Sequence, residues 1–490
     1  MANESIIQAA LHFVPSKEVK MVELDVYDVV RVKEIINHRI RFQLPLDHNE
    51  PNGQSITIMV NITQKYDEKL HGKDKDKKTV LPENPKLICY LQGGPGFPCA
   101  VPLSNSAYTK VLLDRGYQIV YLDQRGTGLS TLLDVETFNQ LVPRKVGEND
   151  DDYTKRQLKF ILNFRADSIV HDAEMIRERL IGESKWSIIG QSYGGFTSFT
   201  YVSMYPDSLK EVLVTGGVPP IGYHADDVYT ATYERTRERN IHYYEKYPQD
   251  KQKVRNILNY LSKNHVKLPN GGVLSVERFQ QIGLGFGGLG GTDNIHQLVL
   301  KFDHDLELFG KPTHNSLISV QNNSSFGTNI IYALFQEAIY CDGPGKPTNW
   351  SADRLRYKHG NEQFVHTTDS DTDIYFTGEM VYKSMWDDFV ELQPFKNLAI
   401  ALHENTEWSK LYDIEKLKET SWEKVSIVAA TYVYDQYVDF DLTRNVKNNI
   451  FKDNGNLKQF ITSEFFHNGI RTDSEKVIGS LLSLLDCEID

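Results

Sequence analysis

The 490-residue sequence predicts an α/β fold, with a mostly parallel central sheet flanked by helices and a large, mainly helical insertion. Short apolar runs typical of buried strands alternate with helical segments in the first part of the chain. Strand periodicity then nearly disappears between residues 219 and 415, and it returns at residues 425–430. We therefore expect residues 1–218 and 416–490 to form one core domain, interrupted by a cap domain at residues 219–415.

The composition of the chain excludes some classes of function. The chain is 40% hydrophobic and 24% charged, as is ordinary for a soluble globular protein. Its net charge of −12 argues against nucleic acid or an anionic membrane as the main partner. The four cysteines lack metal-ligand spacing, no run is apolar enough to span a bilayer, and the start lacks the pattern of a signal peptide. We expect a reduced, cytoplasmic location.

The first elements form an expected antiparallel hairpin. Residues 40–44 and 56–60 alternate apolar and polar side chains, and residues 49–53, Asn-Glu-Pro-Asn-Gly, form a turn sequence between them. The charged run at residues 73–78 is interpreted as a solvated loop without a function.

Glycine-rich segments follow two of the buried strands that we predict next. Residues 87–91 lead into Gln92-Gly93-Gly94-Pro95-Gly96, and residues 117–122 lead into Asp123-Gln124-Arg125-Gly126-Thr127-Gly128. A helix is expected at residues 165–180 and a further strand at 211–217. Because the carboxyl ends of parallel strands meet at one edge, we expect both segments to converge on one crevice.

The central motif of the chain is Gly190-Gln191-Ser192-Tyr193-Gly194, which follows the apolar run at residues 186–189. A helix then continues towards Pro206. G-x-S-x-G between a strand and a helix is the pattern of a nucleophile elbow, in which glycines let the strand and helix pass closely. We expect Ser192 to be the nucleophile and the backbone N–H of Tyr193 to face an oxyanion.

The predicted cap contains helical segments at residues 228–247 and 254–264 and a second glycine pattern. Residues 283–288, Gly-Leu-Gly-Phe-Gly-Gly, match G-x-G-x-x-G, but the preceding residues 278–281 are polar and helix-like. Because the strand of a dinucleotide-binding unit is missing, we interpret this segment as a flexible or tightly packed loop.

A base and an acid are needed to activate a serine hydroxyl, and the last predicted strands supply candidates. The strand at residues 429–433 leads to Asp435, Asp439 and Asp441. The strand at 457–461 leads to His467, which precedes a final helix at residues 474–485. This order of serine, acid and histidine is that of α/β-hydrolases. We expect His467 to be the base and favour Asp435 as the acid by its position, with Asp439 as the alternative.

Taken together, these motifs resemble those of the prolyl iminopeptidases of the α/β-hydrolase superfamily. The resemblance rests on residues 93–96 (GGPG), 123–128 (DQRGTG), 190–195 (GQSYGG), the Tyr434-Asp435 loop and residues 466–469 (FHNG). Gln92 is a departure, because the family commonly has histidine before the glycine pair. This position lies outside the triad, so we expect little effect on the activity.

The resemblance implies a serine aminopeptidase that releases an N-terminal residue, preferably proline, from short peptides with a free N-terminus. Ser192, His467 and Asp435 would form the triad, and Tyr193 with Gly93 or Gly94 would form the oxyanion hole. No metal or organic cofactor is implied. The family uses glutamates of the cap to bind the substrate amine, and Glu337 and Glu379 resemble this pattern. Nearby aromatic residues are candidates for a pyrrolidine pocket: Phe335, Tyr340, Tyr375 and Phe376.

Two other functions stay open at this point. An esterase or thioesterase would use the same triad and would not need the two glutamates. A non-catalytic binding protein of the same fold would be indicated by the loss of a triad member, but none is lost. The sequence leaves the oligomeric state and the strictness of the proline preference open.

Overall fold

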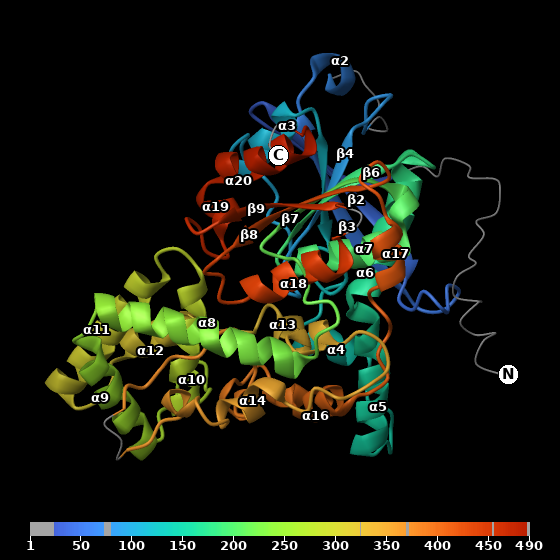
Figure 1. Ribbon diagram of the computed structural model, residues 1–490. Helices are drawn as coiled ribbons and strands as arrows, with labels where there is room; N and C mark the ends of the chain where they lie inside the picture. Colours follow the sequence, from blue (N-terminus) through green and yellow to red (C-terminus); the bar gives the residue numbers. More distant parts are fainter. Residues whose placement is uncertain (1–23, 73–79, 324, 369–371, 453–454, 488–490) are drawn as a thin grey trace.

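The structure is a computed structural model that describes residues 24–72, 80–323, 325–368, 372–452 and 455–487. A central sheet with its flanking helices forms one part of the molecule, and a group of helices forms the other (Figure 1). The charged run at residues 73–78 lies outside the described residues, as does the N-terminal segment. In the part that is described, no helix is long and apolar enough to cross a membrane.

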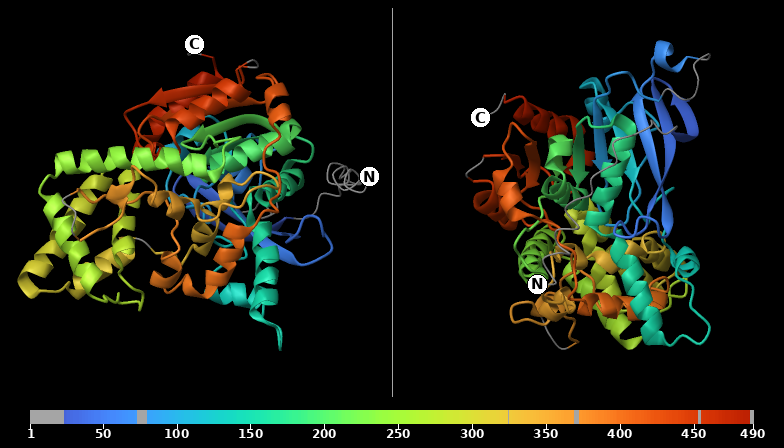
Figure 2. Two further views of the ribbon diagram at one scale, coloured as in Figure 1. Left: turned by 60° about the horizontal axis from the view of Figure 1, so that its bottom comes forward. Right: turned by 90° about the vertical axis from the view of Figure 1, so that its right-hand side faces the viewer.

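The described strands form one nine-stranded sheet in the order β1-β2-β3-β5-β4-β6-β7-β8-β9. The N-terminal strands and the C-terminal strands lie at opposite ends of this sheet (Figure 2). Their bounds are β1 (Asp25–Val32), β2 (Ile35–Pro45), β3 (Ser55–Lys65), β4 (Leu87–Leu91), β5 (Gln118–Asp123), β6 (Trp186–Gln191), β7 (Leu209–Thr215), β8 (Ser426–Tyr432) and β9 (Leu457–Thr462).

The type of strand pairing changes once across the sheet, from antiparallel to parallel. The pairs β1–β2, β2–β3 and β3–β5 are antiparallel, and every later pair from β5–β4 to β8–β9 is parallel. The predicted hairpin is confirmed by the register of β2 and β3, in which Ile40 lies opposite Val60. The mostly parallel sheet predicted from the sequence is confirmed. It brings the carboxyl ends of β4, β6, β8 and β9 to the same edge.

Helices cover both faces of the sheet because its central strands are apolar on both sides. In β4, Leu87, Cys89 and Leu91 pack into a core with α6 and α7, whereas Ile88 and Tyr90 pack into a second core with α3 and α20. The helices outside the long insertion are α2 (Glu68–His71), α3 (Ala107–Asp114), α4 (Val135–Leu141), α5 (Asp150–Ile161), η1 (Leu162–Phe164), α6 (Ala166–Ile181), α7 (Tyr193–Met204), η2 (Pro206–Ser208), α18 (Phe440–Ile450), α19 (Gly469–Thr472) and α20 (Ser474–Leu485).

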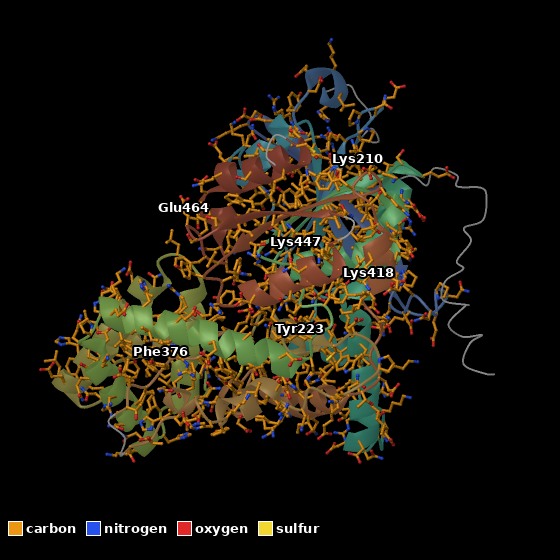
Figure 3. The ribbon with its side chains drawn as sticks, viewed as in Figure 1. Lys210, Tyr223, Phe376, Lys418, Lys447 and Glu464 are labelled. Atoms are coloured by element: carbon orange, nitrogen blue, oxygen red, sulfur yellow. The ribbon has the colours of Figure 1, made fainter. Side chains whose placement is uncertain are left out.

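The chain between β7 and β8 is helical. A third apolar cluster lies within it, and Phe376 of this cluster is labelled in the helical part of the molecule in Figure 3. The helices are α8 (Ala225–Lys246), α9 (Asp250–Lys263), α10 (Val276–Gln280), η3 (Gln281–Gly287), α11 (Gly291–Phe309), α12 (His314–Asn323), α13 (Ile330–Phe335), η4 (Ala338–Tyr340), α14 (Ser351–Arg356), η5 (Glu362–Phe364), α15 (Met385–Asp388), η6 (Gln393–Phe395), α16 (Lys396–Glu404) and α17 (Ile414–Glu419).

The glycine segment at residues 283–288 is tightly packed. It follows helix α10 and forms most of η3, so no strand precedes it. A Cβ at Gly283 would overlap Phe376 and Thr377, and a Cβ at Gly287 would overlap the ring of Tyr437. The glycines therefore allow a close approach between this segment and its neighbours, as one of the two interpretations of the sequence expected.

Candidate active site

Ser192 lies at the turn between β6 and α7 with a left-handed backbone, at φ 56° and ψ −124°. A positive φ is unfavourable for a residue with a Cβ, and such strained residues persist where the surrounding structure holds them in place. Here the Ser192 N–H donates to Thr215 O of β7 at 3.0 Å, and Gly195 N donates to Ser192 O at 2.7 Å. This geometry is that of a nucleophile elbow.

The glycines of the elbow are required by close contacts with backbone atoms. A Cβ at Gly194 would overlap the carbonyl group of Leu91 at the end of β4, and a Cβ at Gly195 would overlap that of Gly217. A Cβ at Gly93 would lie 2.7 Å from Gln191 O and 2.8 Å from Ser192 Cβ. The Gly93-Gly94 segment therefore reaches the serine only because it has no side chains.

His467 and Asp435 form a buried pair beside the elbow. His467 Nδ1 lies 2.8 Å from Asp435 Oδ2, while Asp435 Oδ1 accepts hydrogen bonds from Tyr437 N at 2.9 Å and Val438 N at 3.1 Å. Burial by itself lowers the pKa of His467, but the carboxylates of Asp435 and Glu379 outweigh it and raise that pKa above its usual value. The carboxylate therefore fixes the imidazole and favours its protonated form.

Asp439, the alternative acid, has different partners. Its Oδ1 accepts from Leu442 N at 2.8 Å at the start of α18, and its Oδ2 accepts from Arg235 Nε at 3.0 Å. This is the arrangement of a helix N-cap with a salt bridge. The hydrogen bond from His467 is thus accepted by Asp435 and not by Asp439.

Ser192 and His467 open onto one pocket of about 410 Å³, a size in the range of small-molecule sites. Its lining comes from the ends of β4 and β6, from the long insertion and from the loops after β8 and β9. The lining residues are Gln92, Gly93, Gly94, Phe97, Gln191, Ser192, Leu284, Asn322, Asn323, Ser325, Phe326, Asn329, Tyr332, Glu379, Tyr437, His467 and Arg471. Tyr193 begins α7 beneath this pocket, and the first N–H groups of a helix have no partner within it.

Glu379 carries a carboxylate into this pocket. Its Oε1 accepts a hydrogen bond from the Tyr332 hydroxyl at 2.7 Å. Burial raises the pKa of Glu379, and the opposing effects of His467 and Tyr332 do not cancel this rise. A carboxylate held in a poorly hydrated pocket attracts a cationic ligand strongly.

Glu337, the other expected amine-binding residue, lies elsewhere and is absent from the described pocket lining. Its two carboxylate oxygens accept from Ala352 N at 2.9 Å and Ser351 N at 3.0 Å at the start of α14, and Oε2 lies 3.0 Å from His403 Nδ1. Although burial disfavours its charge, His403 and these bonds lower the pKa of Glu337. Its carboxylate is occupied in holding α14.

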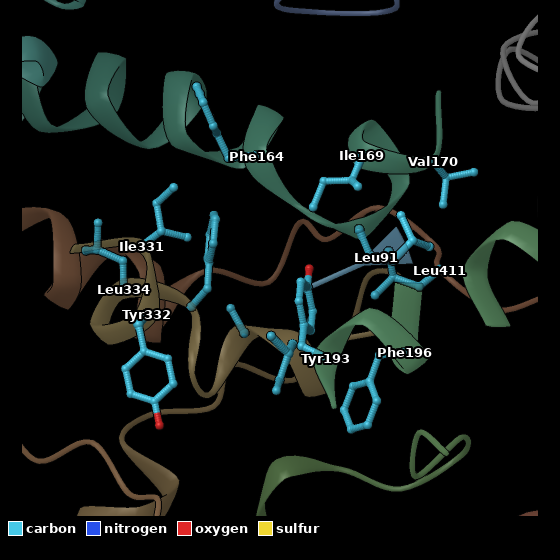
Figure 4. Packing of buried hydrophobic residues seen from close by; sticks show 14 of the residues in the cluster. Leu91, Phe164, Ile169, Val170, Tyr193, Phe196, Ile331, Tyr332, Leu334 and Leu411 are labelled. Atoms are coloured by element: carbon cyan, nitrogen blue, oxygen red, sulfur yellow. The ribbon is translucent and has the colours of Figure 1, made fainter. Parts of the chain in front are cut away.

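The aromatic pocket wall also differs from the expectation. Phe335 and Phe376 are buried in apolar clusters, and the lining described above includes neither them nor Tyr340 and Tyr375. The aromatic residues that do line it are Phe97, Phe326, Tyr332 and Tyr437. In α13, Tyr332 points away from Ile331 and Leu334 (Figure 4). Tyr332 carries the one hydroxyl in the apolar segment IIYALF, which is the sequence signal that could have identified it.

The Asp123-Gln124-Arg125 segment lies next to the crevice and supports it, and none of its residues belongs to the described pocket lining. Arg125 is buried against Asp172, with Nε–Oδ2 at 2.7 Å. Asp123 accepts from Cys99 N and Leu129 N, both at 2.9 Å. Gln124 Nε2 donates to Gln92 O at 3.0 Å and so anchors the loop that carries Gly93.

In the ranges that the structure describes, no group of three or more His, Cys, Asp or Glu side chains is arranged to hold a metal ion.

The fold and the strand–serine–helix geometry define an α/β-hydrolase. Residues 86–256 match the family model described as alpha/beta hydrolase fold. Among solved structures, esterase E22 is 11% identical, with a TM-score of 0.45, over 92% of this chain and 100% of that one.

Two curated relatives specify the family further. The chain is 37% identical to a proline iminopeptidase of Aeromonas sobria, over 91% of this chain and 96% of the relative. It is 34% identical to a proline iminopeptidase of Aspergillus aculeatus, over 92% of this chain and 94% of the relative. The chain belongs to the proline iminopeptidase family of α/β-hydrolases, and it is a hydrolase.

Proposed function

We propose that the protein is a serine aminopeptidase that removes an N-terminal residue, preferably proline, from peptides. The observation that carries this proposal is that Ser192, His467 and Glu379 line one pocket, with His467 hydrogen-bonded to Asp435. The pocket thus combines the groups of acyl transfer with an anion for a protonated amine. Membership of the proline iminopeptidase family supports the same assignment.

In this proposal, the Ser192 hydroxyl oxygen attacks the carbonyl carbon of the N-terminal residue while His467 Nε2 takes the proton. Asp435 holds the imidazole by Nδ1 and stabilises the imidazolium. The oxyanion is bound by the N–H of Tyr193 and one from Gly93 or Gly94. His467 then protonates the departing amine, which leaves an acyl-enzyme. Water, deprotonated by His467, hydrolyses the ester and restores Ser192.

Glu379 is the proposed partner of the substrate's α-ammonium group, which in an N-terminal proline is the protonated pyrrolidine nitrogen. Its carboxylate is oriented by Tyr332, and the same ring forms part of the pocket wall. The ring of Phe97 packs edge-on against that of Tyr332, with 5.4 Å between the ring centroids. The ring of Phe326 stacks on that of Tyr332 with its centroid 6.0 Å away. This aromatic wall suits a pyrrolidine ring better than a charged side chain. Residues 219–415 are the proposed cap, because they supply Glu379 and two of the four aromatic lining residues, Phe326 and Tyr332.

The test compares Glu379→Gln with Glu337→Gln on proline naphthylamide and on an acyl ester without an amine. We expect Glu379→Gln to lower the ratio of kcat/KM for the amine substrate to that for the ester by about ten- to a hundredfold, since a hydrogen bond to a charged group contributes roughly 1.5–3 kcal/mol. Glu337→Gln is the matched control. It should keep the ratio, while its unfolding free energy falls by about 1–3 kcal/mol because Glu337 is buried and bonded to backbone.

The outcomes separate the functions. N-acetyl-proline naphthylamide should resist cleavage by the wild type, because acetylation removes the charge that Glu379 binds. Hydrolysis of the ester alone by the wild type would replace the aminopeptidase with an esterase that shares the triad. Equal ratios for the two glutamine variants would remove Glu379 from the amine site.

A further inference from the structure

Arg471 is a cation in the active-site pocket that the proposed reaction does not use. It lies four residues after His467 and lines the same pocket as Ser192 and Glu379. We infer that Arg471 binds the free α-carboxylate of a short peptide, so that dipeptides and tripeptides are the preferred substrates. This inference rests on the proposed aminopeptidase function.

The backbone of Arg471 is fixed relative to the catalytic histidine. Arg471 N donates to Asn468 O at 2.8 Å, and Asn468 Oδ1 accepts from Leu289 N at 3.2 Å. The preceding Ile470 is buried in the core with α3 and α20. His467 N also donates to Gly287 O at 3.1 Å. The segment that carries both residues is therefore held from two sides, which fixes the backbone of Arg471 relative to that of His467.

The guanidinium of Arg471 is available to a ligand. Within the described residues it makes no hydrogen bond or ion pair, and its side chain is exposed. The arginines next to the site differ in this respect. Arg125 is bound by Asp172, and Arg165 Nη1 donates to Ser409 Oγ at 2.7 Å. An arginine offers paired N–H donors that match the two oxygens of a carboxylate.

The pocket lining includes an acidic and a basic side chain that come from different parts of the chain. Glu379 comes from the long insertion, beside Tyr332 of α13, whereas Arg471 comes from α19, which packs against α3 and α20 of the sheet. Ser192 lies at the end of β6. A short peptide is a zwitterion with its ammonium and carboxylate on either side of the scissile bond. A C-terminal amide has no carboxylate, and the carboxylate of a long peptide lies too far away to reach Arg471. Neither substrate is therefore stabilised by this arginine.

The test measures kcat/KM for prolyl-glycine and prolyl-glycyl-glycine and for their C-terminal amides. For the wild type, we expect at least one of the free acids to be cleaved up to about fivefold faster than its amide, since a partly exposed ion pair contributes up to roughly 1 kcal/mol. Arg471→Gln should bring this acid-to-amide ratio close to one. Arg471→Lys should keep part of the preference for the free acid, because lysine retains the positive charge but lacks the paired N–H donors of the guanidinium.

Arg444→Gln is the matched control, since Arg444 is an exposed arginine of α18 outside the pocket lining, and it should keep the wild-type ratio. Thermal unfolding and labelling of Ser192 by a fluorophosphonate establish that each variant is folded. A wild-type ratio near one, or a ratio that Arg471→Gln leaves unchanged, would overturn the inference. Failure of the wild type to cleave proline naphthylamide and all four peptides would instead overturn the proposed aminopeptidase.

Discussion

His467 sits between two carboxylates, and this arrangement determines how the site responds to pH. Asp435 binds its Nδ1 directly, and Glu379 faces it across the pocket. Both favour the imidazolium, and together they raise the pKa of His467 despite its burial. A general base works only in its neutral form, so a raised pKa moves the onset of activity to higher pH.

The acid limb of kcat/KM should therefore have its midpoint above pH 6.5, about the ordinary pKa of histidine. Asp435→Asn removes the carboxylate that raises this pKa, so it should shift the midpoint to lower pH and lower kcat by about 10⁴-fold. The measurement is a pH profile of proline naphthylamide hydrolysis by the wild type and this variant.

Asp439→Asn is the control for that profile, because Asp439 caps α18 and binds Arg235. It should alter stability and leave the midpoint in place. A wild-type midpoint at or below 6.5, or an unshifted midpoint in Asp435→Asn, would contradict the assigned pair.

The roles of individual side chains were harder to predict from the sequence than the strands and helices. Glu337 and Glu379 both stand in apolar surroundings, and periodicity cannot tell a carboxylate that caps α14 from one that enters a pocket. The difference depends on Ser351, Ala352 and His403, whose approach to Glu337 is set by tertiary structure. For the same reason, the pocket wall was assigned to Phe335 rather than to Tyr332 of the same short helix.

At the scale of elements, the strand–turn–helix unit around Ser192 was predictable because its constraints are local. The apolar run of β6, the glycines and the apolar start of α7 all lie within residues 186–204. Strands β4, β5, β7 and β8 were predicted for the same reason, since each is a short and largely apolar run, whereas the polar strand β1 was not predicted. The side-chain directions of Asp123 and Arg125 depend on distant partners such as Asp172, so the sequence could not predict that they support the crevice without lining it.

Gly194→Ala tests the elbow as a unit. The new Cβ would overlap the Leu91 carbonyl group, so the strand and helix would have to separate. We expect loss of hydrolytic activity and a fall in unfolding free energy of at least about 2 kcal/mol, as for overpacking of a rigid core. Activity and chemical denaturation of the purified variant provide the measurement.

Gly479→Ala is the matched substitution in α20, where the added Cβ would meet no atom within 4 Å. It should raise the unfolding free energy by up to about 1 kcal/mol, because alanine favours a helix over glycine. An active, equally stable Gly194→Ala protein would show that the elbow does not need the close approach to β4.

At the scale of the whole molecule, the pocket is a joint product of the sheet and the long insertion. The sheet supplies Ser192 and the loops with Asp435 and His467, and the insertion supplies Glu379, Tyr332 and Phe326. Gly287 and Leu284 of the insertion also bond to the histidine and aspartate loops, through His467 N and the Tyr437 hydroxyl. Substrate selection and chemistry are thus built on different parts of the chain that contact each other directly.

The central claim is that Ser192 is the nucleophile that releases N-terminal proline. The most direct measurement is proline release from proline naphthylamide by the wild type and by Ser192→Ala at equal concentration. We expect the wild type to turn over and the variant to lose about 10⁴-fold or more in kcat while keeping its thermal unfolding midpoint. Equal proline release by the folded alanine variant would contradict the account.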